Sequence, residues 1–174
     1  MVANFFKYRE SVRGDSMKQG LDVNHINPFL QSAVTIFESM AQMKLGIGKP
    51  SVASLKFDEQ IFALQVGLTG DLKGQIFLVM NIEDAKTVAS KMMCGMPVNE
   101  LDDMAASALA ELSNMVMGNT ATLFSNKNIR IDITPPISMR GAQMQITSDV
   151  QALRIPLLYE GKECIGMYLC VTAE

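Results

Sequence analysis

The stretch Ser107-Ala-Leu-Ala-Glu111-Leu-Ser-Asn114-Met-Val-Met-Gly118 lies inside a long helical pattern of this chain. At 3.6 residues per turn, the four numbered residues fall on one narrow stripe of a helix. The opposite side is apolar, as is typical of a face packed on a core. A carboxylate and a carboxamide therefore stand one turn apart and point away from the core. The expected core-facing residues are Ala105, Ala108, Leu109, Leu112, Met115, Val116 and Leu123.

Three helices are expected around this stretch. The helix that carries it should begin at Asp102, a good N-cap, and end near Asn126. A shorter helix over 83–93 precedes it, with acidic residues at its start. The first helix is expected to open at Asn27-Pro28 and to end near Gly46, because proline is favoured in a first turn.

Extended runs fill the remainder of the chain in two groups. The apolar, β-branched and aromatic composition of these runs favours strands, and glycine-bearing connectors favour hairpins. The order predicts an α+β fold of duplicated helix-plus-three-strand units, with long helices packed on one face of a largely antiparallel sheet. We expect one domain over 23–174, made of two pseudo-repeats, after a polar N-terminal extension over 1–22. The expected strands are 51–57, 61–69, 75–80, 129–134, 142–150, 153–159 and 164–172.

Composition excludes several classes of function. A formal net charge of -3 without a basic cluster argues against a nucleic-acid binder. Three cysteines without a CxxC spacing, and a single histidine, argue against a disulfide framework or a zinc site. No apolar run is long enough for membrane insertion. A reduced, cytoplasmic location is the simplest expectation.

Few residues suit ordinary catalysis. Glu111 lacks a second carboxylate across a cleft, and His25, in an expected turn, is the sole candidate base for a serine nucleophile. Cys94 is expected to be a packed thiol. A group of methionines is expected to fill the core, with an adaptable binding surface as the alternative: Met92, Met93, Met96, Met104, Met115 and Met117. On chemistry alone, Glu111 and Asn114 could be two solvated residues of an exposed helix. A rigidly held carboxamide can, however, orient water for attack on a phosphoryl group, a reaction that depends mainly on positioning.

The pattern Ser107-x3-Glu111-x2-Asn114-x3-Gly118 resembles the signature of the CheC/CheX/FliY phosphatases of bacterial chemotaxis, and CheX-like members resemble the chain most. The resemblance extends over roughly residues 24–172. Further matching stretches are Ile26-Asn-Pro-Phe29, Gly48-Lys-Pro50, Gly67-Leu-Thr-Gly70 with Gly74, Met92-Met-Cys-Gly-Met96, Leu101-Asp102 and Ile131-Asp-Ile-Thr-Pro-Pro136.

This resemblance implies removal of the phosphoryl group from the aspartate of a phosphorylated CheY-like response regulator. By the same resemblance, Asn114 would orient the attacking water and Glu111 would pair with the regulator's active-site lysine. Ser107 and Gly118 would belong to the partner-binding face. No cofactor or metal of the chain's own is implied, since Mg²⁺ would be supplied by the regulator. A homodimer is also implied.

Two questions stay open at the level of sequence. In the first helix, Thr35, Ser39 and Gln42 repeat the spacing of the stripe but lack its carboxylate. They resemble a degenerate second copy of it. The alternative to a phosphatase is a non-catalytic adaptor that binds a response regulator through the same helix face.

Overall fold

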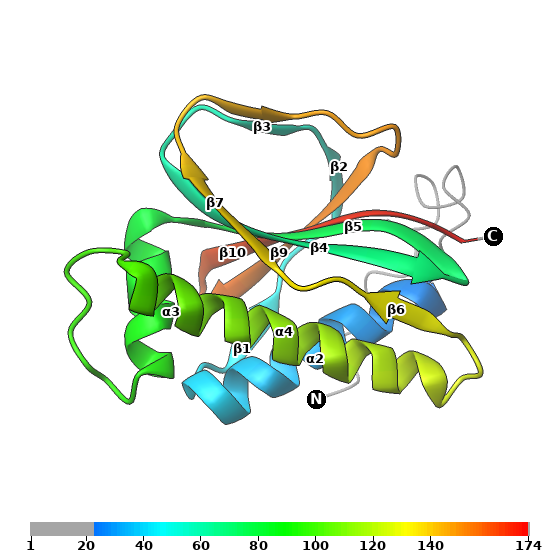
Figure 1. Cartoon of the computed structure of the whole chain (residues 1–174), viewed down its shortest axis with the longest axis horizontal. Coiled ribbons are helices and arrows are strands. Elements are labelled where there is room, and N and C mark those ends of the chain that lie inside the picture. The colour runs from blue at the N-terminus through cyan, green and yellow to red at the C-terminus, as the bar shows by residue number, and fades with distance from the viewer. Residues whose placement is uncertain (1–22, 174) are drawn as a thin grey trace.

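The computed structural model describes residues 23–173, which form three helices on one face of a largely antiparallel sheet (Figure 1). The α+β fold predicted from the sequence is confirmed. The elements are α2 (Val23–Ala41), β1 (Leu45–Ile47), β2 (Ser51–Ala53), β3 (Leu55–Phe57), β4 (Ile61–Gly70), β5 (Leu72–Asn81), α3 (Ile82–Met92), α4 (Asp103–Ser125), β6 (Ile131–Ile133), β7 (Ile137–Gly141), β8 (Met144–Ile146), β9 (Ala152–Tyr159) and β10 (Lys162–Ala173).

The main sheet has the order β1-β9-β10-β5-β4-β6, with β2 also paired to β9 and β7 also paired to β4. At its centre β5 runs antiparallel to β10, from Leu72 opposite Ala173 to Val79 opposite Gly166. A separate ribbon of β3 and β8 arches over the face opposite the helices (Figure 1). The sheet is therefore covered on both faces.

The strand pairings repeat between the two halves of the chain. If β1 to β5 are matched in order with β6 to β10, every pairing has its counterpart: β1 with β9 corresponds to β6 with β4, and β2 with β9 to β7 with β4. The β3–β8 and β5–β10 pairs each map onto themselves. This is the arrangement expected of two repeats related by a two-fold axis, although the domain boundaries proposed from the sequence stay a prediction.

Alternation along β5 divides the interior into two cores. Ile76 and Leu78 face the helices, whereas Phe77 and Val79 face the β3–β8 ribbon. All four side chains are buried, so this strand appears in the sequence as an uninterrupted apolar run. The larger core lies between α2, α4 and the sheet, and it determines where the helices sit.

The first helix differs from its prediction at both ends. It begins at Val23, so Pro28 lies inside it and not in its first turn. Proline has no N–H for the carbonyl four residues before it, that of Asn24. The ammonium of Lys127 donates to this carbonyl at 3.4 Å and replaces the missing bond. The helix ends at Ala41, because Gln42 adopts a left-handed conformation with φ 54°.

The strand predictions were wrong in three places. Residues 45–47, expected at the end of a helix, form β1 at the sheet edge. The run 51–57 divides into β2 and β3, because the chain leaves the main sheet to form the ribbon. Residues 142–150 contain only the short β8, while β7 precedes them unpredicted, because it is five residues long and follows Pro135-Pro136 closely.

The predicted extension over 1–22 lies outside the described residues. Within 23–173, no helix combines the length and apolarity needed to cross a membrane.

Gly74 tests the central pairing. It has φ 141°, and a Cβ at this position would lie 2.0 Å from the Cys170 carbonyl oxygen of β10. We expect Gly74→Ala to lower the free energy of unfolding by about 2–4 kcal/mol, measured by urea denaturation. Gly46→Ala is the control, because its Cβ would meet Leu158 at an ordinary 3.7 Å. Equal stability of the two variants would contradict this account of the β5–β10 contact.

Candidate functional site

The N-terminal end of α4 is held by two polar contacts. The Asp102 carboxylate accepts the backbone N–H of Ala105 at 2.8 Å, as the sequence predicted for an N-cap. The Arg140 guanidinium of β7 donates to the Leu101 carbonyl at 2.9 Å. Because Leu101 and Ala105 are themselves buried, the start of the helix is fixed to the body of the molecule.

Along its length α4 packs against α2. The rings of Phe124 and Phe29 meet edge to face, with centroids 5.3 Å apart. The Asn119 amide donates to the Ser32 hydroxyl at 3.2 Å, across the helix pair. These contacts join residues about ninety positions apart in sequence, and no local pattern indicated them. They hold α4 at a defined rotation about its own axis.

This rotation turns the predicted stripe outward. Ser107, Glu111 and Asn114 are exposed and Gly118 is half-buried, all on the side of α4 away from the sheet. Four of the seven expected core residues are fully buried; Ala108, Met115 and Leu123 are partly exposed, at the borders of the buried face. The structure therefore brings together all four residues singled out in the sequence.

Most side chains next to Glu111 and Asn114 on the helix are small, apart from the partly exposed Met115 four residues after Glu111. Their neighbours at helical spacing include Ser107, Ala108 and Gly118, and a Cβ on Gly118 would meet no atom within 4 Å. Within residues 23–173 neither functional side chain forms an ion pair or a side-chain hydrogen bond. Both side chains are exposed and available to another molecule.

The charged side chains of helix α4 are all negative. Asp103 and Glu111 are its only ionisable residues, and both are acidic. Asp103 lies in the first turn, where a negative charge interacts favourably with the helix dipole. Glu111 lies two turns further and has no such structural role. Its exposed carboxylate is available to a cation on another molecule.

The proposed second copy of the stripe does not form. Thr35 and Ser39 are exposed on α2, but Gln42 lies beyond the end of that helix in a left-handed conformation. Its carboxamide therefore does not continue the helical stripe. The spacing match in the sequence was a coincidence of polar residues, since it ignored where α2 ends.

Burial gives a different correspondence between the two helices. Six of the eight buried residues of α2 have a buried counterpart 83 positions later in α4, from Ile26 and Leu109 to Ala41 and Phe124. In this register Asn114 corresponds to Gln31 and Glu111 to Pro28. Gln31 keeps an amide at the position of Asn114, whereas Pro28 has no carboxylate to match that of Glu111. The carboxylate–carboxamide pair is thus present in α4 and not in α2.

The other chemical groups considered in the sequence lie elsewhere. His25 is in α2 and not in a turn. Cys94 is exposed, so its assignment as a packed thiol was wrong: it follows the end of α3 with a left-handed φ of 58°, which turns the chain away from the core. Among the described residues, no three His, Cys, Asp or Glu side chains are grouped to hold a metal ion.

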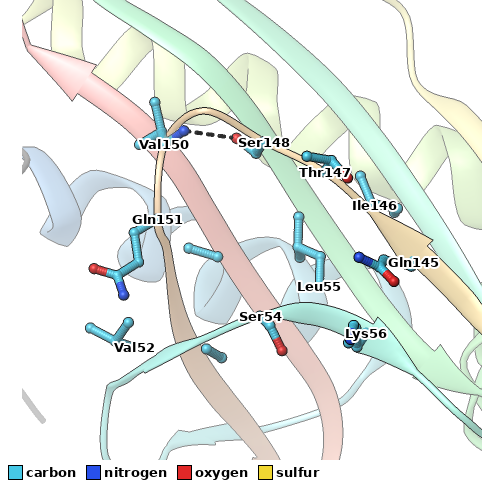
Figure 2. Close-up of a pocket in the computed structure, with 12 residues that line it drawn as sticks. Val52, Ser54, Leu55, Lys56, Gln145, Ile146, Thr147, Ser148, Val150 and Gln151 are labelled. Atoms are coloured by element: carbon cyan, nitrogen blue, oxygen red, sulfur yellow. Dashed lines mark hydrogen bonds between the residues drawn. The ribbon is translucent and has the colours of Figure 1, made fainter.

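Two cavities lie away from α4. The larger, about 470 Å³, opens between the β2–β3 segment and the loop from β8 to β9, with Ser54, Lys56 and Gln151 around it (Figure 2). The smaller, about 200 Å³, includes Asp84 and Glu163. Burial, and secondarily the charge of Glu163, raises the pKa of Asp84.

Comparison with known proteins identifies the family. A model described as "Chemotaxis phosphatase CheX" matches residues 62–158, more than half of the chain. The CheY-P phosphatase CheX of Thermotoga maritima is 30% identical over 151 residues, covering 87% of this chain and 97% of that protein. The chain belongs to the CheX family of chemotaxis phosphatases. The matched region includes all of α4.

Solved structures similar to this CheX-family chain agree with its fold. A chain of the CheX–CheY–BeF₃–Mg²⁺ complex from Borrelia burgdorferi has a TM-score of 0.73 and 30% identity, covering 85% of this chain and 97% of that one. A CheC-like superfamily protein from Shewanella sp. PV-4 has a TM-score of 0.76 and 27% identity, covering 88% and 100%.

The three cysteines should differ in reactivity. Burial raises the pKa of Cys164 to about 12 and also raises the pKa of Cys170, whereas Cys94 is exposed. Because the thiolate is the reactive form, we expect Ellman's reagent at pH 8 to modify Cys94 quickly and the other two only on unfolding. Cys94→Ser should remove the fast phase. Rapid modification of two or more thiols in the folded protein would contradict this burial.

Proposed function

We propose that this protein removes the phosphoryl group from the aspartate of a phosphorylated CheY-like response regulator, with Asn114 and Glu111 as its site. The observation that supports this most directly is the pair itself. Both side chains are exposed and unpartnered among the described residues, on one face of α4 in a chain of the CheX family. The relative from Thermotoga maritima is named as a CheY-P phosphatase, and the Borrelia burgdorferi structure contains CheX with CheY.

In this proposal Asn114 performs the positioning step. Its carboxamide enters the active site of the regulator and holds a water molecule in line with the phosphorus–oxygen bond of the aspartyl phosphate. An amide can accept a hydrogen bond from this water and donate another to a phosphoryl oxygen. Water attacks phosphorus, the bond to the aspartate oxygen breaks, and inorganic phosphate and the free carboxylate are formed. Mg²⁺ belongs to the regulator, where it would neutralise the phosphoryl oxygens.

Glu111 serves to place the helix. Its carboxylate forms a charge-assisted hydrogen bond with the active-site lysine of the regulator. The two residues are three positions apart, about 4.5 Å along the helix axis, so a lysine at one end of the contact fixes the amide at the other. Ser107 and Gly118 keep the neighbouring surface low and allow the regulator to approach. A protruding site of this kind needs no pocket of its own.

An adaptor function is the alternative, and it predicts binding without faster loss of phosphate. The intact carboxamide favours catalysis, because binding alone does not require an amide at Asn114. We further propose a homodimer acting in the cytoplasm, on the likeness to CheX proteins.

Asn114→Ala should abolish catalysis without affecting the fold. Removal of a single positioned hydrogen-bonding group reduces turnover by about 100-fold or more. We expect this loss in the accelerated decay of a Mg²⁺-bound, ³²P-labelled CheY-type regulator, with an unchanged circular dichroism spectrum because the side chain is exposed. Asn99→Ala, at an exposed loop position, is the control. Full activity of Asn114→Ala would refute the proposed mechanism.

Glu111 should act on binding. We expect Glu111→Ala to raise the KM for the phosphorylated regulator by about tenfold, and Glu111→Lys to raise it further through repulsion of the regulator's lysine. Glu100→Lys changes the net charge equally from an exposed position outside the helix and should leave KM almost unaffected. Equal impairment by Glu100→Lys and Glu111→Lys would show that net charge matters and that Glu111 makes no specific docking contact.

A further inference from the structure

The outward face of α4 carries one large apolar side chain that the fold does not use. The exposed large apolar residues of the described chain are Met40, Met96, Met104 and Ile137, and Met104 is the most exposed at 62%. Single exposed apolar residues are common, so exposure alone has no meaning. The position of Met104 is what distinguishes it.

Met104 belongs to the same face as the proposed site. It precedes Ser107 by three residues and Glu111 by seven, which are the spacings of neighbours along one side of a helix. At a rise of 1.5 Å per residue, it lies about 10 Å from Glu111 along the axis. The residues between them on this face, Ser107 and Ala108, are small. Met104 is thus the next large side chain to protrude after Glu111.

The helix itself does not need a methionine there. Asp102 already caps the N-terminus through Ala105, and Leu101 and Ala105 provide its buried contacts. A polar residue with good helix propensity, such as glutamine, would serve equally well in the free protein. The thioether therefore has no evident partner within the described fold, although a flexible and polarisable side chain is well suited to an apolar contact with another molecule.

Apolar contact area beside the pair is limited, since Ala108 and Met115 are only partly exposed. Glu111 offers a charge contact and Asn114 offers a hydrogen bond. Both side chains must lose bound water before they form these contacts. Protein interfaces generally depend on a few apolar or aromatic anchors that exclude water, with the polar contacts giving orientation. Met104 is the side chain placed to supply such an anchor on this face.

We propose that Met104 is a docking residue that inserts into an apolar patch of the phosphorylated response regulator, about 10 Å along α4 from the Glu111 contact. This inference rests on the proposed function, since the occupant is the same regulator. The residue acts on affinity alone: it stabilises the complex in which Asn114 reaches the phosphoryl group, without touching the reacting atoms.

The test compares Met104→Gln with Met104→Leu and Met40→Gln. Binding is measured by titration calorimetry with a CheY-type regulator loaded with beryllofluoride and Mg²⁺, and decay of the phosphorylated regulator is followed at increasing enzyme concentrations. Met104→Gln keeps the length and helix propensity of the side chain and removes its apolar end. Met40, 42% exposed on α2, is the matched control.

We expect Met104→Gln to raise Kd by about tenfold, with the maximal decay rate at saturation kept within about twofold. The Kd of Met104→Leu should lie within about threefold of that of the unaltered protein. The Kd of Met40→Gln should equal that of the unaltered protein. An unchanged Kd for Met104→Gln would overturn the proposal. So would a fall in the maximal rate without a change in Kd, or equal weakening by Met104→Leu or Met40→Gln.

The same data separate the two proposals. If the unaltered protein binds the regulator but does not accelerate decay, the phosphatase proposal fails while the Kd comparison still decides the role of Met104. If the unaltered protein does not bind, the docking proposal fails with it.

Discussion

The antiparallel pairing of β5 with β10 joins the two halves of the molecule and positions everything else. Each strand belongs to a different half of the chain, and the flanking strands exchange partners around them, so neither half completes its sheet without the other. Both faces of these central strands are buried, one by the helices and one by the β3–β8 ribbon. The close approach at Gly74, where no side chain fits, shows how tightly the two backbones pack.

The packing of the helix pair on this sheet explains why the site lies on an exposed helix face and not in either of the two cavities. Packing of α4 against α2 and the sheet uses most of its large apolar residues, and Met104 is the one that stays largely exposed. The Asn114 carboxamide is exposed on this outward side. An enzyme with a pocket brings the substrate to its catalytic groups. Here the catalytic group would be brought into the pocket of another protein, which contributes the phosphoryl group and Mg²⁺ under the proposed mechanism.

Prediction from the sequence succeeded where the pattern was local. The limits of α4 and α3 followed from capping residues, and the existence of the central strands followed from uninterrupted apolar runs. The start of β5 at Leu72, three residues before the expected Gln75, did not follow from the sequence. Prediction failed where distant residues decide the outcome. The Asn24 carbonyl of α2, which Pro28 leaves without its helical donor, accepts from Lys127 on a distant part of the chain. The short β7 and β8 exist because they pair with β4 and β3, and their own sequences carry little preference.

The candidate site shows the same division. The sequence by itself determined that Ser107, Glu111, Asn114 and Gly118 share one face of a helix, because helical periodicity is a local property. It could not show that the second stripe, at Thr35 and Ser39, ends short of Gln42, since that depends on how α2 terminates against the sheet. The apolar side of the pattern also indicated that this face points outward, but only the tertiary structure decided that Met104 is left exposed there. Burial results from contacts between residues far apart in the chain, and no single segment contains that information.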